Sequence, residues 1–266
     1  MRTCISLALL AATLHTAQAA DGRYVVTSCA NGTRLPIAFV ADCSRLGSAA
    51  TRALCATFIE NQACRVYPTY RRLTGIDIAP RCRRIKCIIH DLSSAPGGRD
   101  FGGMAKGCEV AFMAKYAIDL RKDSPIGPHE VHELLHHFRM SSSALKPLTH
   151  GHALFGSSMA EAISQLGDHT TYAQDLKRLR TEADRIEKKL EAPPWPPAHS
   201  TRCRLARLVV ESRVYLERPE TIATIYRAAA ARPTDERDEA GRWLNRLLAD
   251  IGGPTGRALL ASNGCL

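Results

Sequence analysis

Two histidines enclose a glutamate at helical spacing near the middle of the chain, in the run His132-Glu133-Leu134-Leu135-His136. Residues four apart on a helix lie one above the other, so both imidazoles face the same point. Two imidazole nitrogens at about 2.0–2.1 Å can share one zinc ion, and Glu133 then lies within reach of a water molecule that the metal activates. The run predicts a centre with one Zn²⁺ per chain, in which Glu133 is the general base of a hydrolysis.

Two further histidines adjoin the run and are not expected to bind the metal. His129 shares the face of His132 and His136, but it lies about 10.5 Å along the axis from His136, too far for both to bind one tetrahedral ion. His137 points about 100° away from His136 and is expected to pack against other residues or to meet solvent.

Hydrophobic periodicity places the run on a helix that follows a set of strands. Pro128 suits the first turn of that helix. The elements before it are, in order, a hairpin over 23–43, a helix over 48–61, a strand over 85–92, a glycine-rich loop over 97–107 and a strand over 110–120. Together with the helices that follow, they indicate an α+β fold.

The chain after the run reads as helix almost throughout. The expected helices span 158–166, 172–190, 203–218, 220–231 and 236–250, with a short final piece that ends at Cys265. A proline-rich segment over 193–197 cannot continue a helix and marks a stiff boundary. We therefore divide the chain into a signal peptide over 1–20, a catalytic domain with a cysteine-rich N-terminal part over 21–192, and a helical C-terminal region over 198–266.

The first twenty residues predict export. Arg2 precedes a mostly apolar stretch over 5–14 that is too short to span a bilayer, and Ala17-Gln18-Ala19 offers the small residues that signal peptidase reads. No later stretch reaches the roughly 18 uninterrupted apolar residues of a membrane span. The mature protein is expected to be secreted or periplasmic, without a transmembrane segment.

Lysines and arginines outnumber the acidic residues and give a formal net charge of +10, of which the signal peptide carries only Arg2. A basic balance can indicate nucleic acid as a partner. Here the basic residues are scattered, and no dense run of them is interleaved with aromatics. We therefore expect no nucleic-acid partner, and the sequence leaves the oligomeric state open.

Nine cysteines remain after the signal peptide, and in an exported chain they predict disulfides. None forms a Cys-x-x-Cys motif, which argues against a redox dithiol, a haem attachment site or a zinc ribbon. The odd number leaves at least one thiol outside intrachain pairs. Cys203 and Cys265 should pair with each other, because they are the only two cysteines beyond the proline-rich segment. The connectivity of the other seven cannot be deduced.

The run resembles the HExxH motif of the zincin metallopeptidases. Zincins place a small twisted sheet and a backing helix before the active-site helix, with an edge strand that aligns the substrate. The element order over 23–138 is compatible with that arrangement, and the strand over 110–120 would be the edge strand. The resemblance implies a zincin-like catalytic domain, and it covers about residues 23–172.

The resemblance also implies a third protein ligand, whose identity depends on the zincin branch. Metzincins continue as HExxHxxGxxH, but Arg139 and Ser142 hold the positions of the glycine and the last histidine. Gluzincins take a glutamate from a following helix, and Glu161 lies 25 positions after His136. Small neighbours of Glu161 would let its helix approach the metal closely, so Glu161 is expected as the third ligand.

Five other residues are rival ligands or stabilisers of the transition state. Asp168 would be the ligand in an aspzincin-like arrangement, but the chain lacks the GTxxD motif of that branch. His150 and His152 compete for the same role, or they polarise the substrate carbonyl. Gluzincins often use a tyrosine or a histidine for that polarising task, and Tyr172 and His169 lie on the same downstream segment.

The sequence thus predicts a zinc-dependent peptidase that acts on a protein or peptide substrate. Two alternatives stay open, a zinc hydrolase of a non-peptide amide and an exported zincin-like binding scaffold with little or no turnover. Glu133 favours an enzyme, because an inert scaffold has no reason to keep a base between two ligands.

Overall fold

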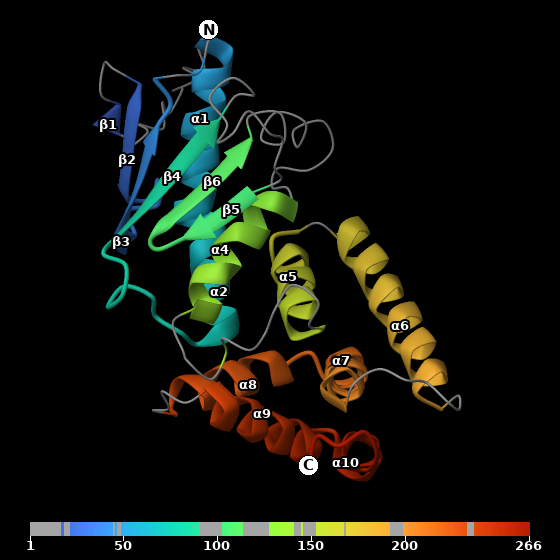
Figure 1. Ribbon diagram of the computed structural model, residues 1–266. Helices are drawn as coiled ribbons and strands as arrows, with labels where there is room; N and C mark the ends of the chain where they lie inside the picture. The colour runs from blue at the N-terminus through green and yellow to red at the C-terminus, as the bar shows by residue number, and fades with distance from the viewer. Residues whose placement is uncertain are drawn as a thin grey trace, which may run out of the picture.

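The computed structural model describes residues 17–18, 22–44, 46, 49–90, 103–113, 128–140, 145, 153–167, 169–191, 199–232 and 237–266. These residues form the expected α+β structure. A mixed sheet and its covering helices make up one end of the described structure, and the last helices of the chain stack at the opposite end (Figure 1).

The sheet is built by the first half of the chain and has the order β1-β2-β3-β4-β6-β5. Its strands are β1 (Ala17–Gln18), β2 (Arg23–Ser28), β3 (Arg34–Asp42), β4 (Arg84–His90), β5 (Gly103–Lys106) and β6 (Glu109–Met113). β3, β4 and β6 are parallel neighbours, whereas β1–β2, β2–β3 and β5–β6 are antiparallel pairs. The hairpin expected over 23–43 is confirmed as β2–β3, and the strand expected over 85–92 as β4.

Two expectations for the region over 97–120 are wrong. The glycine-rich stretch contains the strand β5, and β5 rather than β6 is the outermost strand of the sheet. No apolar alternation reveals β5 in the sequence. It is held by its pairing with β6, by a turn in which Gly107 has φ +60, and by the Cys82–Cys108 disulfide beside that turn. Residues 114–120, where the strand was expected to continue, lie outside the described residues.

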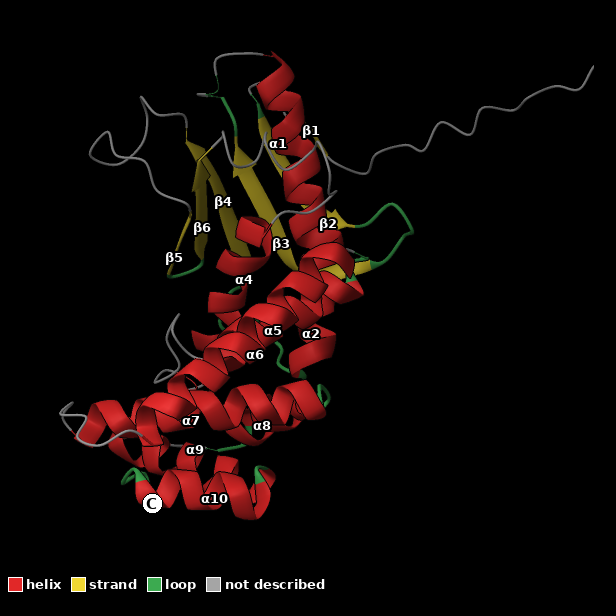
Figure 2. Ribbon diagram, turned by 90° about the vertical axis from the view of Figure 1, so that its right-hand side faces the viewer, coloured by secondary structure: helices red, strands yellow, loops and turns green. Residues whose placement is uncertain are grey.

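One face of the sheet packs against α1 (Ala49–Asn61) and η1 (Gln62–Val66) (Figure 2). The helix α2 (Tyr67–Thr74) follows them and reaches the sheet through Tyr67. β2, β3 and β4 alternate buried residues with more exposed ones, whereas β6 is buried after its first residue, and buried strand residues meet aromatic side chains of these helices. Phe39 contacts Tyr67 with ring centroids 5.7 Å apart, and Phe112 contacts Phe58 at 4.6 Å. The helix expected over 48–61 is confirmed, whereas η1 and α2 were not predicted.

The rest of the described chain is helical, as expected. Its helices are α4 (Pro128–Met140), α5 (Ala153–Gln165), α6 (His169–Glu191), α7 (His199–Glu217), α8 (Thr221–Ala230), α9 (Arg237–Ile251) and α10 (Gly253–Ser262). α5 begins five residues before the expected position. α7 packs against α5 and α6, and α8 packs against α2, so one hydrophobic cluster of buried residues continues from the sheet into the C-terminal helices. None of these described helices is both long and apolar enough to cross a bilayer.

Four disulfides crosslink the described part of the chain. Three of them, Cys29–Cys64, Cys43–Cys55 and Cys82–Cys108, lie in the first half. The fourth joins Cys203 to Cys265, as predicted. Among the described residues, Cys87 is the one free cysteine, and it is buried. The disulfides are consistent with an extracellular or periplasmic location.

Replacing both Cys203 and Cys265 by alanine should lower the free energy of unfolding by about 4 kcal/mol, because the crosslink closes a loop of 62 residues. Chemical denaturation of the oxidised protein measures this loss. Cys87→Ala is the control, since it removes a buried thiol without opening a crosslink, and it should lose less. A double variant that unfolds at the same denaturant concentration as the wild type would contradict the prediction.

Candidate metal centre

The helix predicted for the motif forms as α4 and brings its two histidines together. The Nε2 atoms of His132 and His136 lie 3.3 Å apart. Two zinc–nitrogen bonds of about 2.0–2.1 Å at a tetrahedral angle separate their nitrogens by about 3.3–3.4 Å. The spacing of the two imidazoles therefore fits a shared zinc ion.

Glu133 lies beside this pair and is more buried than either histidine. Its Oε1 atom is 3.9 Å from Nε2 of His132, and its side chain is 5% exposed, against 26% for His132. Burial raises the pKa of Glu133 to about 7. Within the described part of the chain, His132, Glu133 and His136 are the one group of three or more His, Cys, Asp or Glu side chains whose ligand atoms lie within 4.8 Å of one another.

A phenylalanine from α5 packs against both imidazoles. The ring centroid of Phe155 is 5.0 Å from that of His132 and 4.8 Å from that of His136. Phe155 is itself 3% exposed, so this contact excludes water from one side of the histidine pair. The contact also restricts the rotation of both imidazoles. The position of α5 therefore helps to set the orientation of the candidate ligands.

The edge strand β5 covers Glu133 with its backbone. A Cβ atom built on Gly103 would lie 2.5 Å from Oε1 of Glu133 and 2.6 Å from its Cγ, far inside the closest contact that real atoms make. Only a residue without a side chain leaves room for the Glu133 carboxylate at this point. Gly103 is therefore required by the close approach of a strand to the glutamate rather than by its own φ angle.

Gly103→Ala should displace the Glu133 side chain and lower any hydrolysis by about 100-fold, the usual effect of moving a catalytic group by about 1 Å. Turnover of the proposed substrate class measures this effect, and circular dichroism checks the fold. Gly241→Ala on α9 is the matched control, because a Cβ atom there meets nothing within 4 Å. Equal activity of the two variants would show that Glu133 tolerates displacement.

Two hydrogen bonds, one buried and one partly buried, fix α4 against its surroundings. The Tyr70 hydroxyl on α2 donates to the carbonyl oxygen of Val131 at 2.9 Å. On the other side, Nε2 of His137 donates to the carbonyl oxygen of Glu109 on β6 at 3.2 Å. Burial lowers the pKa of His137 to about 4, so this imidazole is neutral. Of the two outcomes expected for His137, packing is the one observed, and it ties the motif helix to the β5–β6 hairpin.

No family model, curated protein or solved structure matches the chain. The chemistry of the centre is therefore inferred from its donor atoms and their spacing. Two imidazole nitrogens at zinc-sharing distance, with a buried carboxylate next to them, suit a site that binds a metal and accepts a proton.

Of the other residues predicted for the site, the described Glu161 and His169 do not belong to the group of ligand atoms around His132. Glu161 lies on α5, where its carboxylate accepts hydrogen bonds from Gln165 at 3.1 Å and from the Tyr215 hydroxyl at 3.4 Å. On α6, His169 is exposed and Tyr172 is half-buried. The remaining predicted residues lie outside the described residues: His150, His152 and Asp168.

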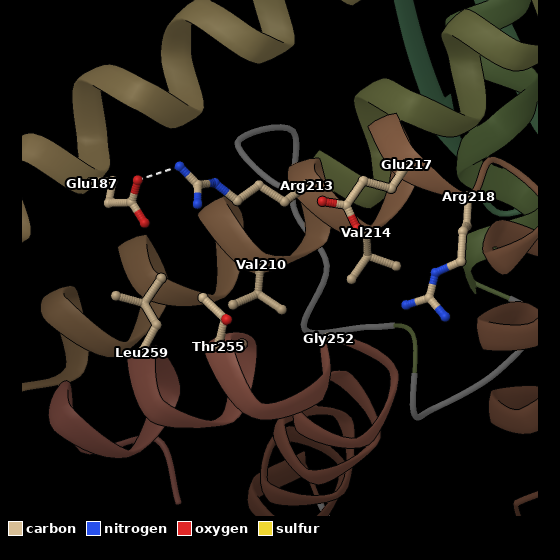
Figure 3. A pocket seen from close by; sticks show the side chains of 10 residues that line it. Glu187, Val210, Arg213, Val214, Glu217, Arg218, Gly252, Thr255 and Leu259 are labelled. Carbon is tan, nitrogen blue, oxygen red and sulfur yellow. Dashed lines mark hydrogen bonds and ion pairs between the residues drawn. The ribbon is translucent and has the colours of Figure 1, made fainter.

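A pocket of about 300 Å³ lies elsewhere, between α6, α7 and α10 (Figure 3). Apolar side chains such as Val210 and Val214 line it. Arg213 at its rim forms an ion pair with Glu187, and Arg218 donates to a backbone carbonyl oxygen. No residue predicted for the metal centre lines this pocket. Its charged side chains stabilise the junction of three helices.

Sequence reasoning missed two residues of the centre, Gly103 and Phe155. Gly103 was assigned to a flexible loop, and the only available signal was the surplus of glycines before the strand over 110–120. Phe155 precedes the expected start of its helix, and an apolar residue between His152 and Glu161 gives no sign of its partner. Both act through contacts between elements that are far apart in the sequence.

Proposed function

We propose that the protein is a zinc-dependent peptidase of the zincin type, in which His132 and His136 hold the metal and Glu133 is the general base. The observation that carries this proposal is the 3.3 Å separation of the two Nε2 atoms, with the Glu133 carboxylate beside them. A histidine pair without this role would have no reason to lie beside a glutamate whose side chain is only 5% exposed.

A zinc ion bound at this position would lower the pKa of a water molecule toward about 7 and polarise a carbonyl group. The residues of the chain supply the other requirements. Glu133 accepts the proton of the attacking water and can pass it to the leaving amine. Phe155 excludes bulk water from one side of the histidines, and the backbone of Gly103 limits where the Glu133 carboxylate can move.

The position of β5 supports a peptide as the substrate. β5 is an edge strand of the sheet, and its first residue lies against the proposed base. Among the described strands β5 pairs with β6 alone, and an extended peptide could pair with its other edge through backbone hydrogen-bonding groups. A substrate held there would lie next to Glu133.

Metal content and turnover test the proposal together. Protein purified from an oxidising compartment should carry one zinc per chain by elemental analysis, and it should cleave an unfolded protein such as casein. A chelator should abolish the cleavage, and added zinc should restore it. Protein that binds no zinc would refute the proposal, and protein that binds zinc but cleaves no peptide would favour the binding scaffold or a non-peptide amide.

The third protein ligand can be identified by substitution. Glu161 is held by Gln165 and Tyr215, whereas the amino end of α5 brings Phe155 to the histidines, and His150 and His152 immediately precede that end in the sequence. Glu161, His150 and His152 therefore stay the candidates for the third ligand. The variant among Glu161→Gln, His150→Ala and His152→Ala that weakens zinc binding by at least about tenfold identifies it. Loss of zinc from Glu161→Gln alone would identify the gluzincin arrangement.

A further inference from the structure

A buried carboxylate on α7 has no part in the proposed chemistry. The Glu211 side chain is 1% exposed. Burial of a carboxylate is unfavourable unless charged or hydrogen-bonding partners compensate for the lost water. Two groups lie close to its carboxylate: the guanidinium of Arg207, with Nε 3.8 Å from Oε1, and the backbone N–H of Leu154, whose nitrogen is 3.2 Å from Oε2.

The second of these groups lies at the amino end of α5. Leu154 is the second residue of that helix, and the first four N–H groups of a helix have no carbonyl partner within it. A negative charge at this end is also favoured by the helix dipole. Glu211 therefore caps the amino end of α5. A capping side chain usually comes from a residue next to the helix in the sequence. Glu211 acts from another helix, 57 residues further along the chain.

The residue that follows Leu154 is Phe155, which packs against both imidazoles of the centre. Any shift of the amino end of α5 moves this ring and changes how tightly the imidazoles are held. A second contact secures the same helix one turn later, where Ser158 donates to the hydroxyl of the buried Tyr226 on α8 at 3.3 Å. α7 and α8 thus hydrogen-bond to the part of α5 that contacts the histidines.

We propose that Glu211 is a positioning residue for the metal centre, which sets Phe155 against His132 and His136 by binding the amino end of α5. This inference rests on the proposed function, because it takes the two histidines as metal ligands. It gives the C-terminal helical region, through α7, a role at the metal centre.

Cobalt substitution tests this role without relying on turnover. Co²⁺ bound in place of zinc absorbs visible light with a spectrum that depends on ligand geometry. Glu211→Gln should keep the helical circular dichroism, alter the cobalt spectrum, and weaken zinc binding by about tenfold. Glu217→Gln is the matched control, since Glu217 is exposed on the same helix. The control should reproduce the wild-type spectrum and zinc affinity.

A double-mutant cycle identifies the path of the effect. Phe155→Leu removes the ring that contacts the histidines, so its effect on zinc affinity should not add to that of Glu211→Gln if Glu211 acts through Phe155. Additive effects, or a wild-type cobalt spectrum in Glu211→Gln, would overturn the inference while leaving the peptidase proposal intact. Wild-type protein that binds neither metal would refute both.

Folding of the variant is a separate risk, because Glu211→Gln leaves Arg207 without its buried counter-charge. If Glu211→Gln does not fold, Glu211→Asp carries the same test. It keeps the charge beside Arg207 but draws the carboxylate back from Leu154. A changed cobalt spectrum in this variant supports the role, and an unchanged one overturns it.

Discussion

Glu133→Gln should bind zinc as the wild type does and lose about 10²–10⁴-fold in hydrolysis, the usual contribution of a positioned general base. Glutamine keeps the shape of the side chain and fits beneath Gly103, but it cannot accept a proton at neutral pH. The two histidines are untouched, so the metal should stay. Zinc content by elemental analysis and cleavage of an unfolded protein are measured on the same preparation.

The control for this variant is Glu109→Gln on β6, which removes a half-exposed carboxylate from the neighbouring strand. Its activity should equal that of the wild type. Equal activity of Glu133→Gln and the wild type would exclude Glu133 as the base. Zinc loss from Glu133→Gln would mean that the Glu133 carboxylate is a metal ligand and not the general base that accepts the proton of the attacking water.

His132→Ala should lose zinc and activity together. It removes one of two imidazole nitrogens that lie 3.3 Å apart, and the remaining protein ligands hold zinc poorly. Activity should fall to the level of chelator-treated wild type. Zinc content and turnover are compared across a range of added zinc.

Reconstitution provides the control for this second variant. Wild type stripped by a chelator should regain activity when zinc is added at a concentration that leaves His132→Ala inactive. A variant that keeps stoichiometric zinc would place the metal elsewhere. A variant that loses zinc but still cleaves the substrate would separate the hydrolysis from this centre altogether.

The parts of the centre that depend on local spacing could be predicted from the sequence. His132 and His136 meet because a helix places residues four apart on one face, whatever packs around it. The pairing of Cys203 with Cys265 followed from counting, since the proline-rich segment isolates them from the other cysteines. The β2–β3 hairpin was predictable because its two strands are joined by a short turn that contains Asn31 and Gly32.

The features that depend on tertiary contacts could not be predicted. β5 is four residues long, without apolar alternation, and it becomes a strand through its pairing with β6. The backbone of Gly103, thirty positions away, lies against the Glu133 side chain and contributes to its burial. A glycine within a glycine-rich stretch gives no sequence signal of such a contact. The capping of α5 by Glu211 likewise joins two helices that no sequence pattern relates.

The free thiol of Cys87 bears on how the chain acquires its disulfides. Cys87 lies on β4, between β3 and β6, and three disulfides form from the six other cysteines of the described first half. Burial raises the pKa of its thiol and so suppresses the reactive thiolate once the sheet has formed. Before the sheet forms, the Cys87 thiol can react with any of the six cysteines that form the three disulfides of this region. We therefore expect the assembly of β3, β4 and β6 to withdraw the Cys87 thiol from disulfide exchange.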